Sequence, residues 1–126
     1  MRAVDTNVLV RLVTRDDLRQ TAAAEAFVTK GAWVPMLALA ETSWVLTAVY
    51  GLKASAIATA IDMMLNHKDL TLQEPEVVAS ALLRFRKRPA LGFSDCLMLE
   101  IARKAGHLPL GTFDRGLSAL DGAVRI

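Results

Sequence analysis

The sequence predicts an α/β protein in which helices cover both faces of a parallel sheet. Short apolar segments alternate with longer segments of helical periodicity along all 126 residues, a pattern typical of parallel sheets. Apolar residues make up 53% of the chain and charged residues 22%, so a sizeable core is expected and disorder is not. No repeat or Gly/Ser linker interrupts the chain. We therefore expect one domain over residues 1–126.

The expected strands are short, and the expected helices have recognisable boundary residues. Asp16 and Ser94 are expected N-caps, Pro75 a first-turn proline, and Gly106 a helix stop. The strands are expected at 2–4, 33–34, 70–72, 107–110 and 123–126. The helices are expected at 6–14, 16–30, 37–50, 55–66, 75–86 and 94–104, with a helical turn at 115–120.

Charge and cysteine content narrow the class of protein only slightly. The net charge of +2 says little about partners. The single cysteine, Cys96, is expected to be buried; it allows no internal disulfide and fits a reducing cytoplasm. The apolar stretch 31–52 resembles a membrane span, but Pro35 lies near its start and Glu41 at its middle, which favours a core helix. We expect a cytoplasmic protein without a membrane partner.

Four acidic residues stand in or beside apolar segments. Asp5 follows the first strand, and Asp114 follows the segment LPLGTF. Glu41 interrupts an apolar helix, and Asp95 opens another. A carboxylate removed from water is costly unless it is paired, hydrogen-bonded or bound to a cation. Parallel sheets collect ligands at the carboxyl ends of their strands, where Asp5 and Asp114 are expected. The pattern indicates one folded site that holds a metal ion.

The helical face that contains Glu41 is expected to point inward, because helical spacing places Glu41 among apolar residues. The apolar members of this face are Leu37, Trp44, Val45 and Ala48. Trp33, Trp44 and Phe85 are expected to pack in the core rather than to stack on nucleotide bases.

Most other kinds of catalytic site are excluded by the sequence. There is no plausible serine or cysteine triad, no glycine-rich phosphate loop, and no CxxC or HExxH motif. The two histidines, His67 and His107, lie in polar or turn contexts and are expected at the surface. An all-oxygen acidic site suits Mg²⁺ or Mn²⁺. Such ions neutralise clustered carboxylates, activate water and stabilise an in-line phosphoryl displacement, so a phosphodiester is the expected substrate.

Four segments carry a resemblance to a known family: VDTNVLVRL, AETSWVL, GFSDCLMLEIARKAG and GTFD. Together they resemble the PIN-domain ribonucleases, and most closely the VapC toxins of type II toxin–antitoxin systems. The resemblance implies a three-layer α/β/α domain with a short-stranded, mainly parallel central sheet. It implies a Mg²⁺-dependent endoribonuclease, with Mn²⁺ as the alternative ion, that cuts structured RNA such as tRNA or rRNA and leaves 5′-phosphate and 3′-hydroxyl ends. The implied partners are a VapB-like antitoxin and a second copy of the chain, in a homodimer or larger complex.

The same resemblance implies roles for individual residues. The implied catalytic acids are Asp5, Glu41, Asp95 and Asp114. Among them, Asp5, Asp95 and Asp114 are the implied metal ligands, and Glu41 would orient water or bind a second ion. Thr6, Asn7 and Thr112 are implied to hold the carboxylates in place.

One departure from the family pattern leaves alternatives open. Many relatives carry a further acid where this chain has Gly116, so a second ion would be held weakly. A catalytically weak or inactive PIN module that binds RNA or a protein is therefore the alternative function. A haloacid-dehalogenase-like phosphatase would need a second aspartate where this chain has Asn7, which argues against that class.

Each candidate residue also has a purely structural interpretation. Asp5 and Asp95 could be ordinary helix-end acids, Asp114 a turn residue, and Glu41 the partner of a buried arginine. A basic cluster precedes the segment of Asp95, and it contains Arg84, Arg86, Lys87 and Arg88. The cluster is interpreted either as a solvated helix end or as a contact to the RNA backbone.

Overall fold

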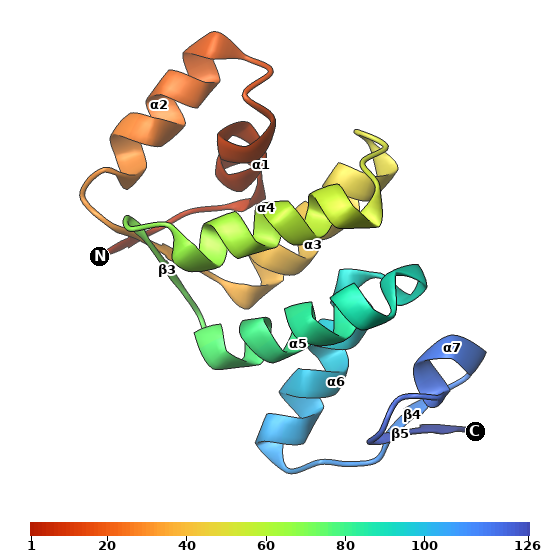
Figure 1. Ribbon diagram of the computed structural model, residues 1–126. Coiled ribbons are helices and arrows are strands. Elements are labelled where there is room, and N and C mark those ends of the chain that lie inside the picture. Colours follow the sequence, from red (N-terminus) through yellow and green to blue (C-terminus); the bar gives the residue numbers. More distant parts are fainter. The chain divides into compact units, whose positions relative to one another are not determined.

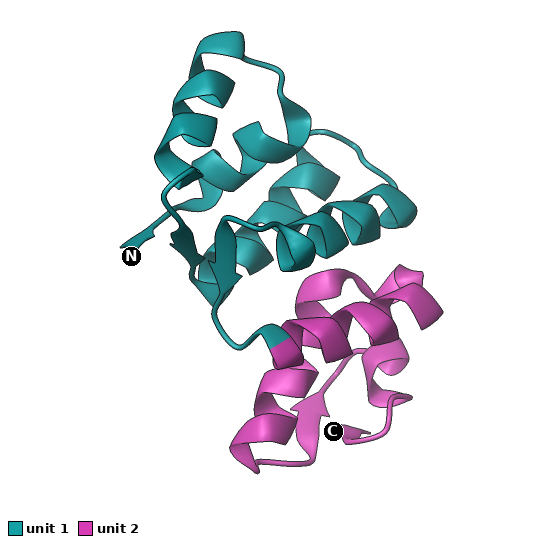
Figure 2. Ribbon diagram, turned by 60° about the vertical axis from the view of Figure 1, so that its left-hand side comes forward, with its two compact units in different colours: residues 1–75 teal, residues 76–126 magenta.

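The computed structural model describes all 126 residues and divides them into two compact units, residues 1–75 and 76–126 (Figure 2). The elements of unit 1 (Figure 1) are β1 (Arg2–Ala3), α1 (Thr6–Thr14), α2 (Leu18–Val28), β2 (Ala32–Val34), α3 (Met36–Ala48), α4 (Ala54–Asn66) and β3 (Leu70–Leu72). Those of unit 2, with α5 starting at the junction, are α5 (Pro75–Lys87), η1 (Pro89–Leu91), α6 (Phe93–Ala105), β4 (Leu110–Thr112), α7 (Arg115–Ser118) and β5 (Ala123–Arg125).

All strand pairs in both units are parallel, which confirms the predicted α/β class. In unit 1 the strand order is β1-β2-β3, and in unit 2 β4 pairs with β5. Helices connect the successive strands of each sheet, as parallel pairing requires. None of the helices combines the length and the apolarity that crossing a bilayer requires.

The sheet of unit 1 is buried on one face and exposed on the other. Val34 and Leu72 are paired in register and buried. The next row across the sheet is Ala3, Trp33 and Thr71, and all three are exposed. The prediction that Trp33 packs in the core is therefore wrong. The fully buried side chains of this unit include Leu9, Val34, Leu39, Leu46, Ile57, Ile61 and Met64.

Helix α3 turns the predicted face outward. Leu37 and Trp44 are 71% and 64% exposed, and Glu41 between them is exposed as well. The buried face instead contains Ala38, Leu39, Thr42, Ser43 and Leu46. The prediction failed because α3 itself carries apolar residues on all its sides, so their spacing does not single out the face that is buried. The hydroxyls of Thr42 and Ser43 donate to carbonyls of their own helix, each at 2.7 Å, so burial leaves neither unsatisfied.

Unit 2 has a leucine cluster beneath its short sheet. Leu99, Leu117 and Leu120 are buried together, and partly buried Leu91, Leu110 and Ala123 pack against them. Phe85 is buried, as predicted, and meets Phe93 edge to face with ring centroids 6.0 Å apart. Cys96 is buried too, as predicted, and burial raises the pKa of its thiol to about 11.

Several element boundaries differ from the prediction. Asp17, not Asp16, caps α2, because its carboxylate accepts from the backbone N–H of Gln20 at 2.9 Å. Helix α6 begins at Phe93, after Gly92 with φ of 80°, so Ser94 is not a cap. Strand β4 starts at Leu110 rather than at residue 107. In contrast, α1 and β3 have the predicted bounds.

Candidate active site

Asp5 marks the carboxyl end of the first strand. The chain is extended at Asp5 and turns into α1 at the next residue. Its Oδ1 accepts from the backbone N–H of Val8 at 3.1 Å, so Asp5 is indeed a helix cap. This bond occupies one carboxylate oxygen and leaves the other available to a ligand.

Glu41 lies beside the first turn of α1, although it projects from the exposed face of α3. Thr6 Oγ1 donates to Glu41 Oε2 over a long 3.4 Å. Unit 1 thus places Glu41 next to the residue that follows Asp5. Its partner is this threonine and not a buried arginine. Asn7 lies elsewhere: it lines a cavity of about 510 Å³ that α1 and α2 border.

Unit 2 brings Asp95 and Asp114 near each other. Asp95 is in the first turn of α6 and is half-buried, whereas Asp114 comes just after β4. Burial, and then the charge of Asp114, raises the pKa of the Asp95 carboxyl. Asp114 Oδ1 accepts from the N–H of Leu117 at 2.9 Å and so caps α7. Thr112 Oγ1 accepts from the backbone N–H of Asp114 at 3.0 Å, which holds the turn in place.

Gly116, the departure from the family pattern, is closely packed. A Cβ at this position would lie 2.9 Å from Leu91 Cδ2 and 3.2 Å from Asp114 Oδ1. An acidic side chain here would have to displace the Leu91 methyl group. Unit 2 therefore offers two carboxylates, Asp95 and Asp114, without a third from this position.

One buried acid, Glu100, is not among the residues predicted from the sequence. It is 6% exposed, and it accepts from Arg103 Nε at 3.2 Å. Arg84 Nε lies 3.8 Å from the same oxygen. Glu100 stands in the apolar run CLMLEIA, so the criterion that selected the other four acids would also have selected it. The arginine pairing considered for Glu41 occurs here instead.

The basic cluster occupies the end of α5. Arg84, Arg86 and Lys87 are in its last turn, and Arg88 follows directly. Arg86, Lys87 and Arg88 are exposed, whereas Arg84 is partly covered and pairs with Glu100. The interpretation of the cluster as a solvated helix end therefore fits Arg86, Lys87 and Arg88 better than it fits Arg84.

The donor set fits a hard divalent cation. In unit 1 Glu41 meets Thr6, the residue after Asp5, and in unit 2 Asp95 lies near Asp114. No group of three or more Asp, Glu, His or Cys side chains is formed. All four donors are carboxylates, the ligands that Mg²⁺ and Mn²⁺ prefer. A cation beside Asp95 and Asp114 would also offset the repulsion that raises the pKa of Asp95.

The parallel strands joined by helices define an α/β protein with carboxylates just after β1 and β4. Comparison with known families gives a more specific class. The PIN domain model matches residues 2–123, nearly the whole chain. The protein therefore belongs to the PIN domain family, whose members are generally metal-dependent nucleases. No curated protein and no solved structure matches the chain significantly.

Proposed function

We propose that this PIN-domain protein is a Mg²⁺-dependent endoribonuclease and the toxin of a type II toxin–antitoxin pair. The observation that supports the proposal is that a member of the PIN domain family carries carboxylates just after two parallel strands and in the first turn of a helix. Asp5 and Asp114 follow parallel strands β1 and β4, and Asp95 opens α6. In a nuclease family, such carboxylates serve phosphodiester hydrolysis.

Each acid has a role in this proposal. Asp5, Asp95 and Asp114 hold the ion, Mg²⁺ or alternatively Mn²⁺, and Glu41 orients the attacking water. When bound, the ion activates water and stabilises the charge that develops on the phosphate. The hydroxyl of Thr6 supports Glu41, and Thr112 holds the turn of Asp114. Residues 1–126 act as one PIN domain in this view.

The proposed partners are structured RNA, a VapB-like antitoxin and a second copy of the chain, all in the cytoplasm. The apolar side chains exposed on α3 support a protein partner. Leu37 is 71% exposed and Trp44 64%, and Val49, just after the helix, is 69% exposed. Large apolar side chains that gather at a surface often mark protein interfaces.

RNA cleavage by the purified, antitoxin-free protein tests the proposal. Total RNA including tRNA is incubated with Mg²⁺ or with EDTA, and the ends of the products are mapped. We expect discrete cuts that need the metal and carry 5′-phosphate ends. Asp5→Asn should reduce cleavage by at least about 100-fold. Substituting a residue that only supports a metal ligand costs up to about 100-fold in activity, and substituting the ligand itself should cost at least as much.

Asp17→Asn is the matched control for this variant. Asp17 caps α2 as Asp5 caps α1, and asparagine caps helices about as well as aspartate. Both substitutions thus preserve their caps, and only Asp5→Asn removes a proposed metal ligand. Equal loss of cleavage in both variants would contradict the assigned role of Asp5.

The alternative function is a catalytically weak PIN module that binds RNA or a protein. Gly116 favours it, because this chain lacks the additional acid that many relatives have there. A folded protein that shows no metal-dependent cutting of any RNA pool would support this alternative.

A further inference from the structure

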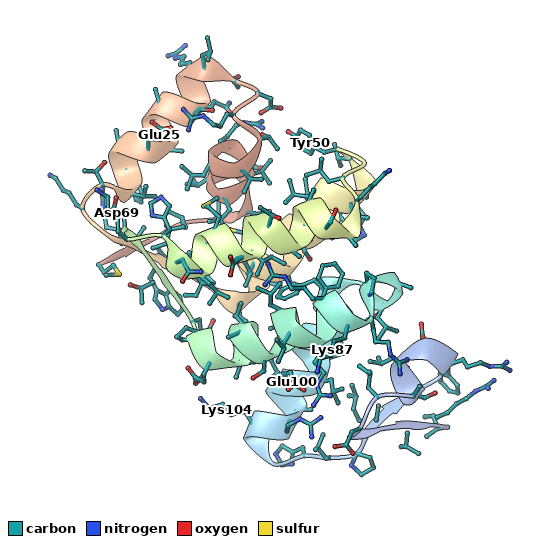
Figure 3. All side chains as sticks on the ribbon, in the orientation of Figure 1. Glu25, Tyr50, Asp69, Lys87, Glu100 and Lys104 are labelled. Atoms are coloured by element: carbon teal, nitrogen blue, oxygen red, sulfur yellow. The ribbon has the colours of Figure 1, made fainter.

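Two cavities border the basic end of α5, and both lie within unit 2. Each has a volume of about 220 Å³, and Arg84 and Lys87 line both. The first is completed by Ser80, Leu83 and Glu100. The second, which we call the α5–α7 cavity, is completed by Arg88, Ala119, Leu120 and Asp121. Figure 3 labels Lys87 on α5 and Glu100 on α6.

The α5–α7 cavity is basic. Arg84, Lys87 and Arg88 face a single acidic residue, Asp121. Lys87 and Arg88 are exposed, and neither takes part in an ion pair. Neither charge therefore has a direct ion-pair partner at this surface. The helix dipole explains why basic residues end α5, but it does not explain why three of them line a cavity together.

Buried Glu100 organises the wall of this cavity. Its carboxylate lies between Arg84 at 3.8 Å and Arg103 at 3.2 Å. Arg103 Nη2 also donates to the backbone carbonyl of Asp121 at 2.6 Å. The chain Arg84–Glu100–Arg103–Asp121 thus ties the end of α5 to the turn after α7. Two residues that line the cavity, Arg84 and Asp121, are thus linked through one ion pair and two hydrogen bonds.

We propose that the α5–α7 cavity binds a backbone phosphate of the RNA substrate through Lys87 and Arg88, with Arg84 behind them. Guanidinium and ammonium groups together suit a phosphate, which accepts charge-assisted hydrogen bonds from both. The inference rests on the proposed ribonuclease function for the identity of the ligand. It assigns three residues of the basic cluster to the site and leaves Arg86, which lines neither cavity, outside it.

RNA binding without cleavage tests the inference. A short, fluorescently labelled uridine oligonucleotide is titrated with the full-length protein in EDTA, and anisotropy is followed over a series of KCl concentrations. The double variant Lys87→Ala/Arg88→Ala is compared with Arg86→Ala, which removes a similar exposed charge one residue away. Arg84 is kept, because its removal would take a partner from buried Glu100. Circular dichroism confirms that both variants are folded.

The double variant should bind about tenfold more weakly, and its salt dependence should become shallower. For single strands, the slope of log K against log salt falls by about 0.7 for each phosphate contact removed. Arg86→Ala should bind like the unchanged protein. Equal weakening in both variants, or none in either, would overturn the inference. Binding of polyglutamate, but not RNA, with the same dependence would overturn it too, because the cavity would then recognise carboxylates.

Cleavage by the same variants separates this inference from the proposed function. If the unchanged protein cuts RNA and binds it without needing Lys87 and Arg88, the function stands and the inference fails. If it cuts no RNA in Mg²⁺ but binds the oligonucleotide through these residues, the inference stands and the nuclease proposal fails. A protein that neither cuts nor binds RNA contradicts both.

Discussion

Each unit contains a carboxylate that more than one other side chain contacts, Asp16 in unit 1 and Glu100 in unit 2, and these two carboxylates differ in burial. In unit 1, Asp16 accepts from Arg11 at 3.0 Å, and from Thr14 and Tyr50 at 2.8 Å each. The Asp16 side chain is 43% exposed. In unit 2, Glu100 lies beside two arginines and is 6% exposed. Figure 3 labels Tyr50 and Glu100, one in each network.

The difference predicts that burial affects stability more than the number of partners does. If Asp16 loses its partners, water can solvate it, and such exposed ion pairs contribute little. Glu100 has no comparable access to water. Its two arginines must therefore offset the cost of burying its charge. The network with fewer hydrogen bonds should therefore affect stability more.

The largest effect is expected for Glu100→Gln. The variant leaves two arginines, each about one-third exposed, without their shared counter-charge. We expect a loss of about 1–3 kcal/mol in the free energy of unfolding, towards the lower end because water reaches both arginines. Urea denaturation followed by circular dichroism measures it.

Glu25→Gln is the matched control for that variant. Glu25 pairs with Arg15, and both side chains are about half exposed. Its substitution should change the free energy of unfolding by less than about 0.5 kcal/mol. If Glu25→Gln and Glu100→Gln proved equally costly, burial would not be what separates the two networks.

A second prediction concerns the buried thiol one turn before Glu100. Burial raises the pKa of Cys96 to about 11, so the native thiol is protonated and should react with a thiol reagent only after unit 2 opens. Glu100→Gln should accelerate labelling about tenfold for each 1.4 kcal/mol by which it lowers the free energy needed to open unit 2. Labelling of the native protein as fast as in urea would show that Cys96 is accessible without opening.

Local sequence signals predicted the elements that have chemical boundaries. Asp5 caps α1 two residues after β1 ends, and Gly106 closes α6 in the left-handed conformation. Both helix boundaries could therefore be recognised from the residues alone. The inward face of α3 could not, since apolar residues cover all its sides. Nor could the choice between Asp16 and Asp17 as the cap of α2, because both can cap and only the backbone geometry decides.

The candidate site was predictable to a similar extent. The positions of Asp5 and Asp114 after strands follow from the apolar pattern, and the structure adds the pairing of Asp95 with Asp114. That all four acids form one site stays a prediction. Glu100 meets the same sequence criterion as the other four acids, but its partner could not be predicted, because Arg84 lies sixteen positions away and only the packing of α5 and α6 brings the two together.

The smallest effect is expected for Asp16→Asn, and pH should reveal its origin. Hydrogen bonds from Thr14 and Tyr50, and the charge of Arg11, lower the pKa of Asp16. A carboxylate whose pKa is lowered by folding stabilises the protein above its unfolded pKa, about 3.9. This contribution disappears as the pH falls through the lower, folded value.

Asp16→Asn should therefore be slightly less stable than the unchanged protein at neutral pH. The difference should shrink below about pH 4 and vanish as the pH falls through the lowered pKa of Asp16. Urea denaturation of both proteins across this pH range measures the difference. A difference that stays constant with pH would mean that the variant loses hydrogen-bond geometry rather than charge. In that case Asp16 would stabilise the protein mainly as a hydrogen-bond acceptor that fixes Tyr50 against α1. Its charge, unlike that of Glu100, would matter little.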